Sequence, residues 1–332
     1  MPESIIQVQD LTKIYQVPER SPGLGASLRG LIKPKYRQVK AVTKINFAVD
    51  LGEMVGLIGP NGAGKTTTLK MLSGLLYPTE GTAHVAGYTP WERQPAYLRR
   101  ISMVMGNRSA MNWDIPPLDS FRVLSKIYDV PEKAYQQILD ELIALLDMEA
   151  LLKKPVRNLS LGERMKCELV AGLLYQPEIL FLDEPTLGLD VAMQRRLRQF
   201  LKQYNQSHAV TVILTSHYMA DVTALCPRVI LIHHGQLLYD GALQSLAEKL
   251  APFKLVKLQF NKPVDDFDGF LQQFQEVELL PKENGHHTLR IPRGDVAQVT
   301  ARLLQQLPIA DLTVEDPPIE AVIDQIYEEG VL

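Results

Sequence analysis

The sequence predicts an α/β protein with a mostly parallel sheet, followed by a smaller α+β domain. Three observations support this prediction. Strand-like and helix-like segments alternate over the first 240 residues, which is typical of a parallel sheet with helices on both faces. A glycine-rich loop at Gly59–Thr66 joins an apolar strand to an amphipathic helix. After Gly241 the order of elements changes, and 332 residues suffice for one full domain and a smaller one.

The first domain is expected to span residues 1–245. Its expected strands are Ile5–Leu11, Ile45–Val49, Met54–Ile58, Thr82–Val85, Ile101–Met105, Ile179–Leu182, Val210–Thr215 and Val229–Ile232. Its expected helices are Lys65–Leu76, Gly162–Tyr175, Val191–Tyr204 and Tyr218–Leu225. A stretch rich in Pro, Gly and basic residues, about 18–40, predicts an inserted loop. A helical pattern over 118–152 interrupts the alternation and predicts a helical subdomain at about 107–165.

The second domain is expected to span residues 246–332. Its expected elements are strand Leu255–Phe260, helix Phe267–Phe274, strand Val277–Leu280, strand Thr288–Ile291, helix Val296–Leu307 and strand Leu312–Val314. The order βαββαβ is the ferredoxin-like arrangement. A hairpin turn holding His286 and His287 is expected between the middle strands, and a terminal helix Ile319–Glu329 is expected after two prolines.

Composition excludes several classes of protein. The net charge of −3 argues against nucleic-acid binding, for which a basic excess is usual. Cys167 and Cys226 lie far apart, so neither a disulfide framework nor a zinc site is predicted. No secretory signal is predicted, and no apolar run approaches the ~20 residues of a membrane-spanning helix. Any membrane function is expected to require a partner.

The loop at residues 59–66 predicts a phosphate-binding site. It has the pattern GxxxxGK[ST], and its residues are Gly59, Pro60, Asn61, Gly62, Ala63, Gly64, Lys65 and Thr66. Glycines let backbone N–H groups turn toward phosphates, and the following helix adds the positive end of its dipole. Lys65 is expected to contact the terminal phosphates, and the Thr66 hydroxyl is expected to bind Mg²⁺. The alternative is a purely structural glycine-rich turn.

Two further segments could complete such a site. An apolar strand ends in Asp183 and Glu184, which suit Mg²⁺ binding and water activation, although acids at a strand end often only cap the next helix. In Asn158–Glu163, Ser160 can cap a helix and Gly162 allows close backbone approach, which gives a second helix N-terminus suited to phosphate. An ordinary capped helix start is the alternative. Otherwise this second N-terminus faces the same nucleotide or that of another subunit.

In order and spacing these motifs resemble those of the ATP-binding cassette family. The resemblance covers roughly residues 5–240 and rests on five motifs: Gly59–Thr66, Leu159–Glu163, Ile179–Glu184, Leu189-Asp190 and Ser216-His217. It implies a P-loop NTPase core with a RecA-like parallel sheet, N-terminal antiparallel strands and a helical subdomain. It also implies an ATPase using ATP and Mg²⁺, in which two subunits clamp ATP head to tail.

The resemblance also implies a role for each matching residue. Glu184 is implied to activate water, His217 to contact the γ-phosphate, Asp190 to link the two sites, and Tyr15 to stack on adenine. Thr67, Ser160, Gly162 and Glu163 are implied to join the loop in binding nucleotide, and Thr66, Asp183 and Asn107 to bind the metal. For Tyr15 a half-exposed tyrosine at a strand end is the alternative, and for His217 a packed core histidine.

Finer features resemble bacterial exporters of the drug- and viologen-efflux type. They are Gly87–Trp91, Asn112-Trp113-Asp114, Leu161 at a usual glycine position, and Pro317–Glu320. This resemblance implies separate membrane permease subunits, a homodimer or heterodimer of ATPase subunits, and a peripheral position on the cytoplasmic face of the membrane. A cassette protein acting on ribosomes or DNA, and a nucleotide-gated binding module, are the alternatives.

Asn107 departs from the family pattern. It stands where the family carries a glutamine that touches Mg²⁺ and links the nucleotide to the membrane subunits. Asparagine offers the same amide on a shorter side chain. We therefore expect contact through a bridging water or an inward shift of the backbone.

Overall fold

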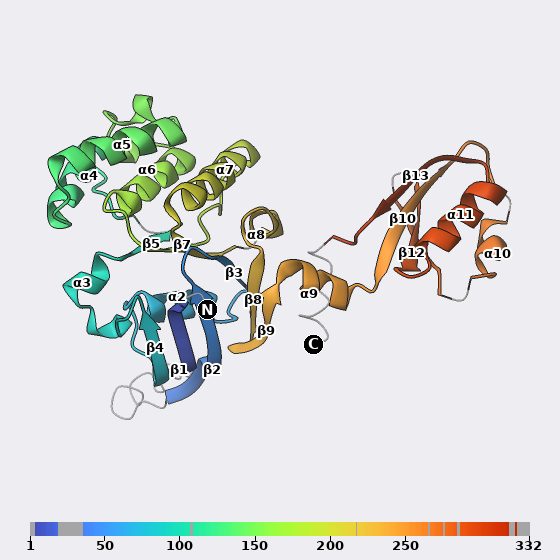
Figure 1. Cartoon of the computed structure of the whole chain (residues 1–332), viewed down its shortest axis with the longest axis horizontal. Coiled ribbons are helices and arrows are strands. Elements are labelled where there is room, and N and C mark those ends of the chain that lie inside the picture. Colours follow the sequence, from blue (N-terminus) through green and yellow to red (C-terminus); the bar gives the residue numbers. More distant parts are fainter. Residues whose placement is uncertain are drawn as a thin grey trace, which may run out of the picture. The chain divides into compact units, whose positions relative to one another are not determined.

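The computed structural model describes the chain in two compact units, residues 1–243 and 244–332 (Figure 1). The described residues are 4–18, 36–106, 109–216, 218–264, 266–274, 276–283, 286–318 and 323. Among them, no helix is both long enough and apolar enough to cross a membrane.

A six-stranded sheet forms the centre of the first unit. Its strands, in spatial order, are β5 (Ile101–Met105), β6 (Ile179–Asp183), β7 (Thr211–Thr215), β3 (Met54–Ile58), β8 (Arg228–His233) and β9 (Gln236–Ala242). The first five are parallel, and β9 is antiparallel to β8. Every residue of β3 and β7 is buried, which explains their unbroken apolar runs. The predicted parallel sheet is confirmed.

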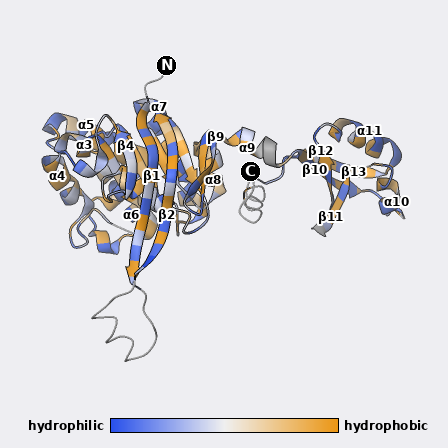
Figure 2. Ribbon diagram, turned by 90° about the horizontal axis from the view of Figure 1, so that it is seen from below, coloured by the Kyte–Doolittle hydropathy of each residue, from blue (hydrophilic) through white to orange (hydrophobic). Residues whose placement is uncertain are grey.

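A second sheet in this unit is antiparallel, with the order β2 (Tyr36–Asp50), β1 (Ser4–Pro18) and β4 (Glu80–Val85). Hydrophobic and hydrophilic bands alternate along β1 and β2 (Figure 2), as expected for strands with one face in the core. The predicted range of the inserted loop, about 18–40, is too long, because β1 and β2 remain paired as far as Pro18 and Tyr36. Residues 19–35 lie outside the described part of the chain.

Helices cover the sheets of the first unit and form a group of their own, and α9 stands where the second unit begins. They are α2 (Lys65–Leu72), η1 (Pro90–Glu92), α3 (Pro95–Leu98), α4 (Pro117–Ile127), α5 (Glu132–Leu146), η2 (Glu149–Leu151), η3 (Val156–Asn158), α6 (Leu161–Leu173), α7 (Val191–His208), α8 (Met219–Leu225) and α9 (Leu243–Leu250). Figure 1 places α4, α5 and α6 together at one end of the unit and β1, β2 and β4 at the other. The helix expected to reach Leu76 ends at Leu72, because Gly74 turns the chain with φ 73°.

The second unit has the predicted βαββαβ order. Its elements are β10 (Phe253–Phe260), α10 (Phe267–Leu271), β11 (Glu278–Glu283), β12 (His286–Pro292), α11 (Val296–Gln306) and β13 (Ile309–Glu315). The sheet order β11-β12-β10-β13, antiparallel throughout, confirms the ferredoxin-like arrangement. His286 and His287 lie in β12, so the turn expected to hold them is shorter than predicted. The terminal helix expected at 319–329 falls outside the described residues, apart from Ile323.

Candidate active site

Three loops that follow neighbouring parallel strands meet at one edge of the six-stranded sheet. β3 pairs with β7, and β7 pairs with β6, so their carboxyl ends lie side by side. Gly59 follows β3, Ser216 follows β7, and Glu184 follows β6. Ligands of open parallel sheets bind at this edge, outside the carboxyl ends of the strands. The fold therefore brings together motifs more than 100 residues apart.

The loop at residues 59–64 depends on glycine at two close approaches. Gly59 has φ 155°, and a Cβ added there would lie 2.1 Å from the carbonyl oxygen of Ile232. Gly64 has φ 113°, and a Cβ there would lie 2.5 Å from the carbonyl oxygen of Ala41. Pro60, Asn61, Gly62 and Ala63 complete the loop, and Thr66 and Thr67 stand in the first turn of α2. The backbone at Ile232 and at Ala41 thus confines the loop, and the N–H groups of the loop can face an anion.

Lys65 lies buried beneath this loop. Its Nζ donates hydrogen bonds to the carbonyl oxygens of Gly59 at 2.6 Å and Pro60 at 3.1 Å. Burial lowers the pKa of Lys65, and the nearby carboxylates of Glu184 and Asp183 oppose that shift. The ammonium group is therefore held between the loop and the two acids predicted at the end of β6.

Thr66 and Asp183 form an oxygen-rich pair at the start of α2. The Thr66 hydroxyl lies 2.9 Å and 3.0 Å from the two carboxylate oxygens of Asp183, and the Thr215 hydroxyl donates to the same carboxylate at 2.8 Å. Hydroxyl and carboxylate oxygens are ligands that Mg²⁺ binds. The residues present therefore fit a magnesium ion bound through Thr66 and Asp183.

Glu184 is held through its backbone. Its φ is 55°, in the left-handed region, as at nine other described residues that are not glycine. Its N–H donates to the carbonyl oxygen and the hydroxyl of Thr215, both at 3.1 Å. These bonds hold Glu184 at the end of β7, next to Ser216. Asn107 and His217 lie outside the described residues.

The helix predicted to begin at Ser160 is capped as expected. The Ser160 hydroxyl accepts from the Glu163 N–H at 3.3 Å, and the Glu163 carboxylate accepts from the Ser160 N–H at 2.8 Å. These hydrogen bonds lower the pKa of Glu163, so it is a carboxylate at neutral pH. Gly162 stands in the first turn of α6, and Asp190 caps α7 by accepting from the Met193 N–H at 2.8 Å.

Tyr15 lies in β1, opposite Val39 of β2. Its ring is half-buried, and the Lys13 ammonium stands 5.4 Å from the ring centroid. A half-exposed ring with a cation on it fits both the predicted stacking on adenine and the strand-end alternative.

Comparison with known proteins decides the family. The ABC transporter family model matches residues 42–187. The chain is 32% identical over 214 residues to the ABC transporter ATP-binding protein NatA of Bacillus subtilis, covering 64% of this chain and 87% of the relative. It is also 32% identical over 295 residues to the doxorubicin resistance ATP-binding protein DrrA of Mycobacterium tuberculosis, covering 86% and 88%.

The chain belongs to the ATP-binding subunits of ABC transporters. It is an ABC ATPase, and the resemblance stated from its motifs is confirmed. A solved dimeric bacterial ABC transporter cassette shares the fold, with a TM-score of 0.59 and 21% identity over 71% of this chain and 98% of that one. Residues 252–315 match the C-terminal domain of EvrA-like ABC transporters.

A buried ion pair in this ABC ATPase was not found from the sequence. Asp221 on α8 is fully buried and pairs with Arg198 on α7 at 2.8 Å. Its other carboxylate oxygen accepts from the hydroxyls of Thr186 at 2.5 Å and Ser216 at 2.7 Å. Thr186 lies two residues after Glu184. The pair thus joins the segment after β6 to the segment after β7. The sequence did hold a signal for this pair, because Asp221 lies among the apolar residues of the buried face of α8.

A second buried acid was also missed. Glu168 on α6 accepts hydrogen bonds from the Ser109 hydroxyl and the Ala110 N–H. Burial raises its pKa, while these hydrogen bonds oppose the shift. Glu168 therefore fixes the segment that begins two residues after Asn107 to the helix that begins at Ser160.

Proposed function

We propose that this ABC ATPase hydrolyses ATP to drive an exporter whose membrane-spanning subunits are separate chains, on the cytoplasmic face of the membrane. One observation carries the proposal: Lys65, Thr66, Asp183 and Glu184 converge at the carboxyl edge of the parallel sheet. The name of the relative DrrA, a doxorubicin resistance protein, supports export as the direction of transport.

Each residue of the site has a chemical task in this proposal. The backbone N–H groups of the loop and the Lys65 ammonium bind the phosphates of ATP, and Tyr15 stacks on its adenine. Thr66 and Asp183 hold Mg²⁺, which when bound neutralises phosphate charge. Glu184 accepts a proton from the attacking water, and His217 contacts the γ-phosphate. Asn107, through its amide, relays the state of the metal to the membrane partner.

The second helix N-terminus suits a dimer of ATPase subunits. α6, capped by Ser160, and α2 lie in different parts of the first unit (Figure 1). We therefore assign Ser160, Gly162 and Glu163 to the nucleotide of a second ATPase subunit, with Asp190 linking the two sites. Support comes from exposed apolar side chains beside these motifs, namely Leu161, Leu187, Val191 and Tyr218. The partner is a copy of this chain or a related ATPase.

A cavity of about 260 Å³ offers a place for the membrane partner to bind. It lies between β5, α4 and α6 and is lined by Met103, Leu124, Tyr128 and Tyr175, among others. Exposed apolar residues belong to this region: Leu75 lines the cavity, and Ile127, which precedes the lining residue Tyr128, is 63% exposed. A partner that inserts an apolar segment there would contact both the core and the helical group.

The second unit is proposed to regulate the enzyme or stabilise the dimer. Its core holds Val256, Leu258, Leu289, Ile291 and Leu303, among others, so its strands and helices pack on one another. The ABC transporter family match ends at residue 187, and a separate C-terminal domain match covers 252–315, which favours an accessory role for the unit.

Steady-state hydrolysis of Mg-ATP by the purified chain tests the proposal. Lys65→Ala should abolish turnover and tight ATP binding, because the charge facing the terminal phosphates is lost. Lys70→Ala is the matched control, since Lys70 lies on the same helix but outside the site. Equal turnover of Lys65→Ala and the parent chain would show that the site is wrongly assigned.

A further inference from the structure

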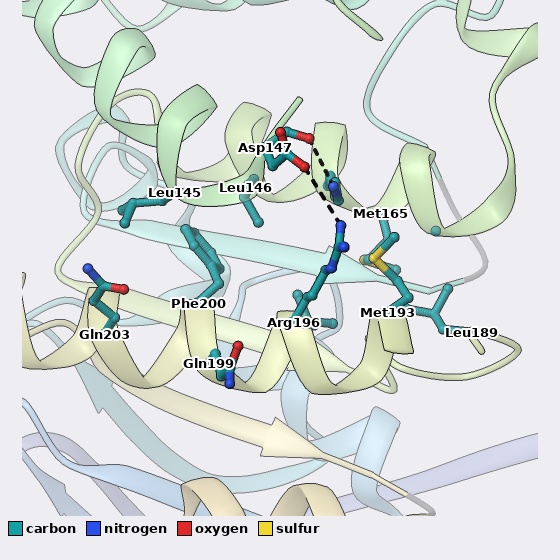
Figure 3. Close-up of a pocket in the computed structure, with 13 residues that line it drawn as sticks. Leu145, Leu146, Asp147, Met165, Leu189, Met193, Arg196, Gln199, Phe200 and Gln203 are labelled. Carbon is teal, nitrogen blue, oxygen red and sulfur yellow. Dashed lines mark hydrogen bonds and ion pairs between the residues drawn. The ribbon is translucent and has the colours of Figure 1, made fainter. Parts of the chain in front are cut away.

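A cavity of about 250 Å³ lies between α5, α6 and α7. Its apolar wall includes Leu146, Met165, Leu197 and Phe200. Phe200 points from α7 toward Leu146 (Figure 3), so the ring closes one side of the cavity. Pockets that bind small molecules are mostly apolar with a few placed polar groups, and this one lies just below their usual volume of about 300–1,000 Å³.

The polar groups of this cavity are unbalanced in charge. Lys166 is only 5% exposed, and its Nζ donates to the backbone carbonyl oxygen of Asp147 at 3.1 Å. Arg196 points from α7 toward Asp147 (Figure 3), but its guanidinium is 3.8 Å from a carboxylate that is 81% exposed. Two cations therefore line the cavity against one acid, and the Arg196 side chain, at 62% exposed, also reaches solvent.

The two cations also repel each other. Burial lowers the pKa of Lys166, and the positive charge of Arg196 lowers it further, while the charges of Asp147 and Glu163 oppose the shift. An anion placed between these groups would relieve that repulsion and return hydrogen bonds to a buried ammonium. Because an apolar wall lies next to these cations, the cavity favours a ligand that has both an anionic group and an apolar body.

We propose that this cavity binds a small amphipathic anion, with a carboxylate or sulfonate head at Lys166 and Arg196 and an apolar body of one or two rings against Phe200. The cavity also contacts Gly162 at the start of α6 and Leu189 just before α7. A bound ligand would hold these two helix starts together and slow ATP hydrolysis. That consequence rests on the proposed function, whereas the binding itself does not.

Titration of the full-length chain with naphthalene-2-sulfonate, a fluorescent anion with two rings, tests the site. We expect one site per chain, from which 2-naphthoate displaces the probe. Arg196→Gln should weaken binding about threefold to fivefold, as expected for losing a partly exposed charge contact, and Arg196→Lys should restore most of it. Arg195→Gln is the matched control, because Arg195 is the exposed neighbour on α7 and does not line the cavity.

Lys65→Ala separates this site from the nucleotide site. It should bind the probe like the parent chain even where it no longer hydrolyses ATP, so failure of the proposed function would leave the binding result standing. Equal affinities of Arg196→Gln and Arg195→Gln, or several weak sites shared by all variants, would overturn the proposal.

Discussion

Glu168 accepts a hydrogen bond from the backbone N–H of Ala110 at 2.9 Å, which joins α6 to the segment that follows β5. The same carboxylate accepts from the hydroxyl of Ser109. α6 begins at the Ser160 cap, and β5 ends just before Asn107. One buried side chain thus connects two motifs assigned to ATP hydrolysis.

The first prediction concerns the pH dependence of stability. The pKa of Glu168 is raised by burial, so the folded chain binds this proton more readily than the unfolded chain. Stability should therefore fall as pH rises from the unfolded pKa, near 4.5, to the higher folded pKa. Glu168→Gln removes this titrating group, so the free energy of unfolding of the variant should fall less over the same pH range. Urea unfolding at several pH values, followed by tryptophan fluorescence, measures the difference. Parallel curves for both chains would contradict the prediction.

The second prediction concerns Glu184. Glu184→Gln should bind Mg-ATP but lower turnover by about 10²–10⁴-fold, because the amide is not a general base. The chain should then accumulate as an ATP-bound dimer, seen by light scattering after gel filtration. Glu149→Gln, at an exposed position on η2, is the control and should behave like the parent. A Glu184→Gln chain that stays monomeric with ATP, with and without its membrane partner, argues against the dimer.

The third prediction concerns the ion pair between Asp221 and Arg198. Arg198→Met should lower the free energy of unfolding by about 3–5 kcal/mol, because it leaves a buried carboxylate without its cation. Arg99→Met is the matched control, since the pair of Arg99 with Asp129 is more than half exposed, and it should cost less than about 1 kcal/mol. Trp91 and Trp113 are the only tryptophans of the chain, so their fluorescence during urea unfolding follows the first unit alone. Equal losses of unfolding free energy in the two variants would mean that burial of Asp221 does not increase the cost of removing its cation.

The fourth prediction concerns the second unit. Truncation after Ala251 should keep ATP affinity, because every residue assigned to the nucleotide precedes that point, and should weaken the ATP-dependent dimer. ATP titration and sedimentation of the truncated and full-length chains measure both effects. Loss of ATP binding by a truncated chain with unchanged tryptophan fluorescence would refute this division of labour.

Local chemistry explains what could be predicted from the sequence alone. The loop Gly59–Thr66 needs glycine where backbone approaches closely, and Ser160 with Glu163 forms a cap that a short pattern specifies. Buried parallel strands such as β7 give apolar runs, so the alternation of elements was visible without coordinates. β9 and α9 were not predicted. β9 is an edge strand with a weak burial pattern that includes Gly241.

Only the tertiary structure decided which distant residues meet. Thr215 bonds Asp183 and Glu184 because β7 lies between β3 and β6, an order that no local pattern states. Asp221 and Glu168 lie on helices where an acid normally faces solvent, and only packing shows that each is buried with its own donors. Sequence specifies contacts between neighbours through backbone geometry, whereas the pairing of buried charges depends on how whole elements pack.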